Sequence, residues 1–516
     1  MKINKWIVAA FAALALLSCQ EKEEPQPKDT TPAELKSFAL LKADNAALPA
    51  DVVAEISANM VIRVPGTEAG KKFTATVTAG ENDEIKVNGV APDENGKVEV
   101  NSAAPIDIIV TNTKSELTAT YEVKIGKILA TIVTPVGSYT EAETSWRSEV
   151  CLAINPKDNT PYVAYARKKT SEDPADKNNR IAVVKWDGSA FVPVGTPGIT
   201  DGTSRQAMLC DLAIDGETPY VLFYGEITAN VPGALKFDGS AWTSVGTQEF
   251  GERITASYGL PKLYFIDGKP GFVTTHNVSK TDPYRNAVRY NFNGTSWDQT
   301  PFIPGLPKYG EKGGSDGMFY SARVATDSKG TVYAVTSNNL YGYYVFNVSN
   351  SWETLVDNYI PDGETYGVPS SLAIKVGPND AVYVLGAISS KAQYQIYRYN
   401  KDAATKLETF AGPVQVTPGS SGAVKETMCF GINPTTGEIV GAYIMEGKLY
   451  FAVIDENRQW TEFKEVEGVK TPSAGDSIAL EFAPDGTGYI AVIAKVESVS
   501  SIELFKIGLE ADVLPE

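Results

Sequence analysis

The segment K-W-D-G-S-A-F-V-P-V-G occupies residues 185–195, and its near copy K-F-D-G-S-A-W-T-S-V-G occupies residues 236–246. Shorter copies begin at Tyr290 (Y-N-F-N-G-T-S-W) and at Phe346 (F-N-V-S-N-S-W). An Asp-Gly or Asn-Gly pair between apolar runs is a strong hairpin signal, because glycine adopts a positive φ without steric cost. Each copy therefore predicts a turn between two antiparallel strands, and the repetition predicts a fold assembled from similar sheets.

A second repeated element precedes these hairpins. It reads C-L-A-I-N-P from Cys151, D-L-A-I-D-G from Asp211 and C-F-G-I-N-P from Cys429. Each copy pairs a short apolar strand with a turn, so the full unit contains four strands, as in a propeller blade. The inner strands are expected near Leu152, Leu212, Leu263, Val324, Leu372, Phe430 and Leu480. The sequence therefore predicts an all-β chain whose residues 128–516 form a seven-bladed β-propeller.

The seventh unit lacks a fourth strand. Strands are expected at 489–494 and 502–507, and the sequence ends before another could form. The segment 131–137, T-I-V-T-P-V-G, ends like the fourth strands at 191–195 and 242–246. We expect it to complete the last blade and close the ring, since closure pairs edges that would otherwise be open.

A large aromatic residue follows most of the hairpin turns. These residues are Phe191, Trp242, Trp297, Trp352 and Trp460. Large aromatic side chains dominate the energetics of interfaces, so we expect them to lie between neighbouring blades. The alternative is that they form platforms on which sugars stack.

The first residues form a targeting segment. Lys2 and Lys5 precede an apolar run at 6–17, which is long enough for a signal peptide and short for a membrane span. The run ends in L-L-S-C and resembles the lipobox of bacterial lipoproteins, which implies cleavage after residue 18 and a diacylglycerol on Cys19. The alternative is an ordinary secretory peptide with an incidental cysteine. Residues 19–34 are polar, contain proline and predict a disordered tether.

The acidic residues after Cys19 resemble the export signal of Bacteroidetes surface lipoproteins, which implies an outer-membrane protein at the cell surface.

Residues 35–127 contain short alternating strands that suit a small β-sandwich. The expected strands are 61–64, 73–78, 85–87, 97–100, 106–111 and 118–125. The opening S-F-A-L and the closing Y-E-V-K-I resemble the Ig-like modules of those lipoproteins.

Charge and composition exclude several classes of function. The 46 Lys and Arg residues against 63 Asp and Glu residues give a net charge of −17, which repels nucleic acid and anionic membrane. A single histidine, His276, cannot form a His-rich metal site, and no Cys-x-x-Cys spacing exists. We therefore expect no metal, no cofactor and no catalytic residue. Cys151, Cys210 and Cys429 are expected to be small buried side chains rather than reactive thiols.

The residues before and at the start of the inner strands are expected to surround one mouth of the central channel. The candidate ligand-binding residues there are Trp146, Arg147, Arg205, Tyr258, Tyr320, Arg323 and Tyr366. Glu426 and Asp476 hold the same position in the last two blades. Aromatic faces stack on sugars while polar groups bind hydroxyls, so this set suits a carbohydrate. The alternative is that these side chains fill the channel.

The propeller resembles sialidase-like, Kelch and galactose-oxidase-type propellers in general form. Degraded copies of the sialidase S-x-D-x-G-x-x-W box, such as D-S-K-G-T-V-Y from Asp327, retain only the turn. Three functions stay open: a non-catalytic surface protein that binds glycan, a divergent sialidase-like glycoside hydrolase, and a scaffold that binds an envelope protein. Fold alone does not decide among them.

The lipobox generates the first test. Replacing Cys19 by Ala removes the sulfur that carries the diacylglycerol, so the protein should move from the membrane fraction to the soluble fraction. Fractionation and immunoblotting measure this directly. Retention of the Cys19→Ala variant in the membrane fraction would contradict the lipoprotein interpretation.

Overall fold

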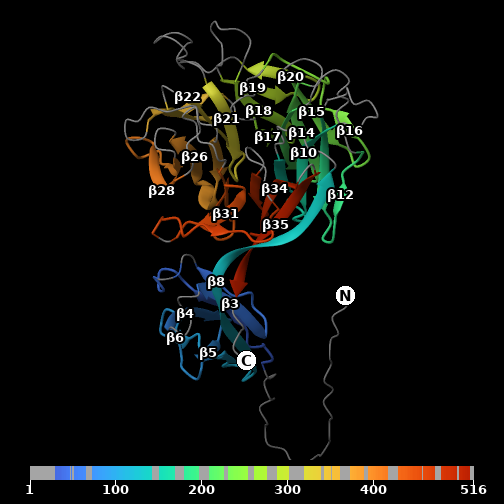
Figure 1. Ribbon diagram of the computed structural model, residues 1–516. Helices are drawn as coiled ribbons and strands as arrows, with labels where there is room; N and C mark the ends of the chain where they lie inside the picture. Colours follow the sequence, from blue (N-terminus) through green and yellow to red (C-terminus); the bar gives the residue numbers. More distant parts are fainter. Residues whose placement is uncertain are drawn as a thin grey trace, which may run out of the picture. The chain divides into compact units, whose positions relative to one another are not determined.

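The computed structural model describes the protein as two units, one within Met1–Leu129 and one within Ala130–Glu510 (Figure 1). The described residues are 29–46, 48, 51–65, 72–141, 150–168, 179–196, 208–225, 231–253, 261–275, 287–300, 319–338, 342–349, 351–360, 372–388, 393–415, 428–455, 457–470, 478–496 and 499–511. Cys19 and His276 lie outside this set. The described residues are almost wholly β-structure, and no helix among them is long and apolar enough to cross a membrane.

The first unit contains two sheets around one hydrophobic cluster. The first has the order β2 (Val52–Val53), β1 (Leu35–Leu40), β4 (Lys72–Ala79) and β6 (Lys97–Asn101). The second contains β5 (Asp83–Val87), β7 (Ile106–Asn112), β8 (Thr118–Glu141) and β3 (Asn59–Pro65), with β3 parallel to β8. In β4 and β7 the buried and exposed side chains alternate, because successive residues of a strand face opposite sides. Phe38, Phe73 and Ile108 are among the buried members of the shared core.

The second unit is a β-propeller of consecutive antiparallel sheets. Six four-stranded sheets among its described residues are formed by strands that follow one another in the chain. They are β9 (Val150–Ile154), β10 (Pro161–Lys168), β11 (Asn179–Trp186) and β12 (Phe191–Pro193); β13 (Met208–Asp215), β14 (Thr218–Tyr224), β15 (Pro232–Phe237) and β16 (Trp242–Ser244); β17 (Leu263–Ile266), β18 (Lys269–Thr275), β19 (Ala287–Phe292) and β20 (Trp297–Thr300); β21 (Phe319–Thr326), β22 (Val332–Asn338), β23 (Gly342–Asn347) and β24 (Glu353–Tyr359); β25 (Leu372–Val376), β26 (Val382–Ile388), β27 (Gln393–Tyr399) and β28 (Leu407–Gln415), with a 3-10 turn η3 (Pro378–Asp380); and β29 (Met428–Ile432), β30 (Ile439–Met445), β31 (Lys448–Val453) and β32 (Lys464–Glu465).

The last sheet of the propeller draws strands from both ends of the chain. It continues from β33 (Ile478–Phe482) through β34 (Gly488–Val496) and β35 (Val499–Ala511) to β8. Val136 and Tyr139 of β8 join the hydrophobic cluster that contains Ile502 and Leu504 of β35. The segment 131–137 therefore supplies the fourth strand of this sheet, as its sequence predicts.

One difference from the expected strands concerns β8. The sequence predicts separate strands at 118–125 and 131–137, but the structure has a single strand, Thr118–Glu141, that takes part in the sheets of both units. The intervening segment G-K-I-L-A contains apolar and β-branched residues and no turn pair that would interrupt an extended chain.

The inner strands form a closed ring. β9 contacts β13, and contacts continue in order through β17, β21, β25, β29 and β33, which contacts β9 again. Hydrophobic clusters lie between neighbouring sheets: one combines Ala164 of β10 with Val221 of β14, and another combines Val440 of β30 with Ile490 of β34. Burial between blades, rather than within them, therefore holds the ring together.

A recurring contact, which we call the blade joint, connects the end of one blade to the aromatic residue of the next. The indole Nε1 of Trp242 donates to the carbonyl oxygen of Val194 at 2.7 Å. Trp297 donates in the same way to Val245, also at 2.7 Å. The glycine after each valine, Gly195 or Gly246, has a φ of 74° or 81°, and both approach the incoming ring closely. For Trp242 and Trp297, the prediction of packing between blades is confirmed.

A related contact occurs at the ring closure. A Cβ atom on Gly137 of β8 would lie 2.4 Å from Cζ3 of Trp186 in β11. The valine and glycine of the closing strand thus meet the first sheet much as Val194 and Gly195 meet the second. Glu438 provides a further contact with the closing strand, because its carboxylate accepts a hydrogen bond from Thr131 Oγ1 at 3.0 Å.

Gly137 allows a test of the ring closure. Gly137→Ala should lower the free energy of unfolding by about 1–3 kcal/mol, because the added methyl group overlaps the Trp186 ring. Chemical denaturation followed by circular dichroism measures this. Gly508→Ala is the matched control, since a Cβ there meets no atom within 4 Å, and we expect a change within about 0.5 kcal/mol. Equal stability of the two variants would show that the Gly137–Trp186 contact does not hold the ring closed.

Candidate functional site

The inner strands enclose a central cavity of about 410 Å³. This volume lies within the roughly 300–1,000 Å³ typical of small-molecule sites. Each inner strand is the last strand of its sheet on the inner side, so one edge of its backbone has no partner strand within the described sheets. Such an edge presents amide and carbonyl groups that can form hydrogen bonds with water or a ligand. The cavity wall therefore presents polar backbone groups between its mostly apolar side chains.

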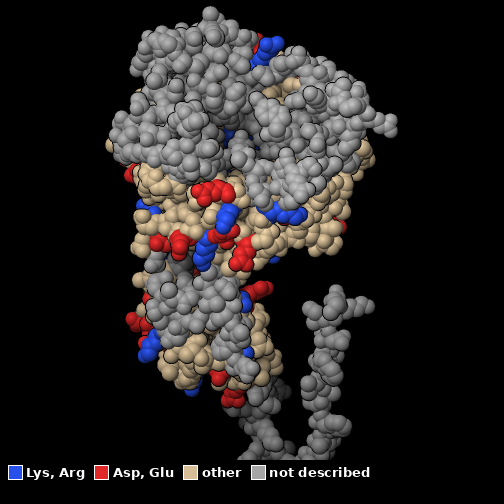
Figure 2. Space-filling model, in the orientation of Figure 1, with Lys and Arg blue, Asp and Glu red and all other residues tan. Residues whose placement is uncertain are grey.

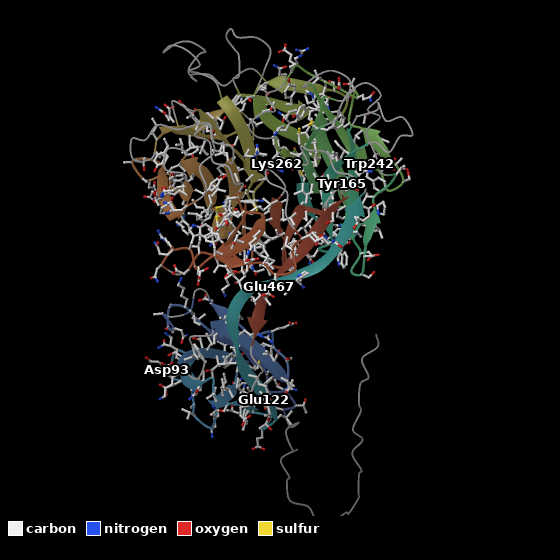
Figure 3. All side chains as sticks on the ribbon, in the orientation of Figure 1. Asp93, Glu122, Tyr165, Trp242, Lys262 and Glu467 are labelled. Carbon is white, nitrogen blue, oxygen red and sulfur yellow. The ribbon has the colours of Figure 1, made fainter. Side chains whose placement is uncertain are left out.

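Charged side chains from separate strands line this cavity. In the part of the chain that the structure describes, they are Asp211, Lys262, Arg323, Lys375 and Glu481. Figure 3 places Lys262 near the middle of the propeller and Trp242 further out. Since a charged group is costly to remove from water, its position inside a ring of apolar blade interfaces indicates either a structural ion pair or a binding role.

Asp211 and Lys262 form the most constrained pair. Lys262 Nζ lies 2.7 Å from Asp211 Oδ1, and Asp211 Oδ2 accepts the backbone N–H of Leu263 at 2.8 Å. The Asp211 side chain is only 8% exposed, whereas that of Lys262 is 37% exposed. Both oxygens of Asp211 are thus directed at the neighbouring strand, and the pair links β13 to β17.

Lys262 remains charged over the physiological pH range. Burial acts to lower its pKa, but the Asp211 carboxylate and the Cys151 sulfur outweigh this effect and raise the pKa of Lys262 above its ordinary value. Arg323 opposes them, because a second positive charge disfavours protonation of Lys262.

A second ion pair spans a longer part of the ring. Lys375 Nζ on β25 lies 2.5 Å from Glu481 Oε1 on β33. This ion pair therefore connects two strands that are separated in the ring by β29. Cys429 of β29 interacts electrostatically with both groups, and burial raises the pKa of its thiol to about 12. A thiol with such a pKa stays protonated at neutral pH and is a poor nucleophile.

The cysteines otherwise behave as small core residues. Cys151 and Cys210 are buried, and all three cysteines beyond Cys19 are free of disulfide bonds. Lys262 Nζ donates a long hydrogen bond to Cys151 Sγ at 3.9 Å. Within the described residues, no group of three or more His, Cys, Asp or Glu side chains could hold a metal ion.

The structure describes few of the residues that the sequence proposes for ligand binding. Arg323 lies in β21, is half-buried and lines the cavity. Five others lie outside the described residues: Trp146, Arg147, Arg205, Tyr258 and Tyr366. Tyr320 was expected just before an inner strand but is the second residue of β21, because a register shift between Phe319 and Ser321 extends the pairing with β22. The side chain of Tyr320 is not described.

Asp211, Lys262, Lys375 and Glu481 were not among the residues proposed from the sequence. The sequence does contain a weak signal for Asp211, Lys262 and Arg323. Each directly precedes the apolar residue that marks its inner strand, as in Asp211-Leu212, Lys262-Leu263 and Arg323-Val324. The residue type at this position varies between blades, with Cys151 and Cys429 the only type that recurs, so a search for repeated motifs passes over it.

Comparisons with known proteins give structural neighbours of low similarity. No family model and no curated protein matches the chain. The Swd1 β-propeller domain of Myceliophteria thermophila is 11% identical, with 72% of this chain and 99% of that chain covered and a TM-score of 0.46. A quinonprotein alcohol dehydrogenase-like protein of Bacteroides thetaiotaomicron is 12% identical, with 80% and 94% covered and a TM-score of 0.38. The Dos1 propeller is 9% identical, with 72% and 95% covered and a TM-score of 0.42. None of these likenesses bears on activity.

The Asp211–Lys262 pair yields a stability prediction. Lys262→Met leaves the nearly buried Asp211 carboxylate without its cation, which should cost about 1–3 kcal/mol of unfolding free energy. Lys329→Met is the control, since the Lys329 side chain is 76% exposed in its pair with Asp380, and it should leave the melting temperature nearly unchanged because exposed ion pairs contribute little to stability. Thermal unfolding compares the variants, and equal melting temperatures would contradict a structural role for the pair.

Proposed function

We propose that this chain is a Bacteroidetes-type lipoprotein, anchored to the outer membrane at the cell surface through a lipid on Cys19. It carries an Ig-like module followed by a seven-bladed propeller, and the propeller binds glycan without changing it chemically. The observation that carries the proposal is the central cavity, which combines a ligand-sized volume with a mostly apolar wall that carries several charged side chains on a closed ring.

The arrangement of carboxylates favours binding over hydrolysis. A glycoside hydrolase uses two carboxyl groups, one as a proton donor and the other as a base or nucleophile. Asp211 and Glu481, the acidic residues that line the cavity within the described part of the chain, are each bonded to a lysine. Each of these two carboxylates therefore already has a cationic partner within the protein.

The sequence next to the inner strands supports a carbohydrate ligand. Trp146, Tyr258 and Tyr366 come shortly before inner strands, and Tyr320 lies within one. Aromatic rings next to arginines offer stacking faces together with hydrogen-bond donors. Binding residues commonly lie on segments positioned by a rigid scaffold. We expect weak affinity, because a flexible sugar loses conformational freedom when it binds.

A glycan array probed with the protein lacking residues 1–19 tests the proposal. At least one glycan should bind, and the double variant Trp146→Ala, Tyr320→Ala should weaken that binding at least tenfold without changing the melting temperature. Leu117→Ala, an exposed apolar side chain in the other unit, is the control and should leave binding unchanged. An array on which no glycan binds would overturn the proposed function.

A further inference from the structure

The central cavity is surrounded by the ring of inner strands. Its described lining residues belong to β9, β13, β17, β21, β25, β29 and β33, or directly precede one of these strands. Contacts between neighbouring inner strands close the ring, so the cavity has no opening between the blades. A ligand must therefore enter along the axis of the ring, and a linear molecule enters by one of its ends.

An ion pair narrows the cavity at one end of this axis. Lys375 is the fourth of the five residues of β25, and Glu481 is the fourth of the five residues of β33. Both side chains thus lie near the turns that lead to the second strands of their sheets. They meet at 2.5 Å although β29 lies between their strands, so they extend over part of the opening. We therefore expect entry from the opposite end, where Lys262 directly precedes β17.

Two polar side chains of the lining have hydrogen-bonding capacity that no described residue uses. The Lys262 ammonium donates to Asp211 Oδ1 and, at long range, to Cys151 Sγ, which leaves one of its three N–H groups. Glu481 Oε1 accepts from Lys375, whereas no described group donates to Glu481 Oε2. The Lys262 side chain is 37% exposed and the Glu481 side chain 39%. A sugar hydroxyl both donates and accepts, so it can bond with either group.

The location of these groups makes their bonds with a ligand more favourable than bonds on the surface. Figure 2 shows acidic and basic residues intermixed on the described surface, where water solvates them. In the cavity the neighbouring side chains are mostly apolar, and a hydrogen bond is stronger in such surroundings than in water. The apolar wall also suits the C–H face of a sugar ring.

We propose that the central cavity binds the terminal residue of a glycan chain, with Lys262 and Glu481 as hydrogen-bond partners of its hydroxyls. This inference rests on the proposed glycan binding and specifies which part of the glycan is recognised. An internal sugar residue has a neighbour on each side, and the Lys375–Glu481 pair lies where the second neighbour would continue. The rest of the glycan extends out along the axis of the ring.

The test caps one end of the glycan at a time. The probes are maltohexaose, cellohexaose, mannohexaose and chitohexaose, each in the free form, reduced to the alditol at one end, or 4-O-methylated at the other. Any other glycan that binds on the array is capped at each end in the same way. Calorimetry with the protein lacking residues 1–19 should show that one cap weakens binding at least tenfold while the other changes it less than threefold. Capped forms that both bind like the free glycan would overturn terminal recognition.

Variants then assign the effect to the cavity. Glu481→Gln should weaken binding of the uncapped glycan at least tenfold, because a neutral amide accepts a weaker hydrogen bond than a carboxylate. Glu481→Asp, which keeps the charge but shortens the side chain by one methylene group, should weaken it as well. Glu465→Gln is the matched control, since Glu465 also pairs with a lysine, Lys448, but lies at the edge of its sheet away from the inner strand. Binding that both Glu481 variants retain unchanged would overturn the assignment to this cavity.

The outcomes separate this inference from the proposed function. Binding that neither cap affects would overturn terminal recognition while glycan binding stands. The capping experiment uses the protein without substitutions, so its result does not depend on the stability of any variant. If no glycan binds in the free form, both proposals fail.

Discussion

The structure of the propeller depends on the contact between an indole ring and the valine and glycine that end the preceding blade. Trp242 and Trp297 each donate a hydrogen bond to a valine carbonyl and cover the adjacent glycine. These hydrogen bonds are partly buried, and glycine accepts both the positive φ and the close approach of the ring without steric cost. Because such contacts join one blade to the next, each sheet gains stability from its neighbours rather than from a core of its own.

Much of this arrangement could be predicted from the sequence, because the relevant residues recur. The Asp-Gly turns after Trp186 and Phe237 indicated the hairpins, and the shared ending Val-Gly identified 131–137 as a strand of the last sheet. The continuity of β8 was not predicted, since no local signal distinguishes one long strand from two short ones that follow each other. Whether a strand stops at the boundary between two units depends on the strands with which it pairs. Those strands are distant in the sequence.

The cavity was harder to predict than the fold for a related reason. Structural positions repeat in residue type from blade to blade, whereas cavity positions differ: Asp211, Lys262 and Arg323 occupy corresponding places before Leu212, Leu263 and Val324. A ring brings three non-repeating residues from successive blades to one location. Their significance becomes visible only when the inner strands are placed around a common axis. The same rigidity that fixes these charges suits a binding site that requires little rearrangement.

The last sheet is formed by two segments that are distant in the sequence, and this also determines when the propeller can finish folding. The closing strand in β8 is synthesised long before β35 beside it, and Thr131 meets Glu438 across 307 residues of sequence. Contacts of such separation form slowly, because the loop must close before any contact stabilises it. Until then the edges of two strands are exposed to other chains. A chain that lost β33, β34 and β35 would be an open arc rather than a smaller ring, so the integrity of this sheet governs the assembly of the whole propeller.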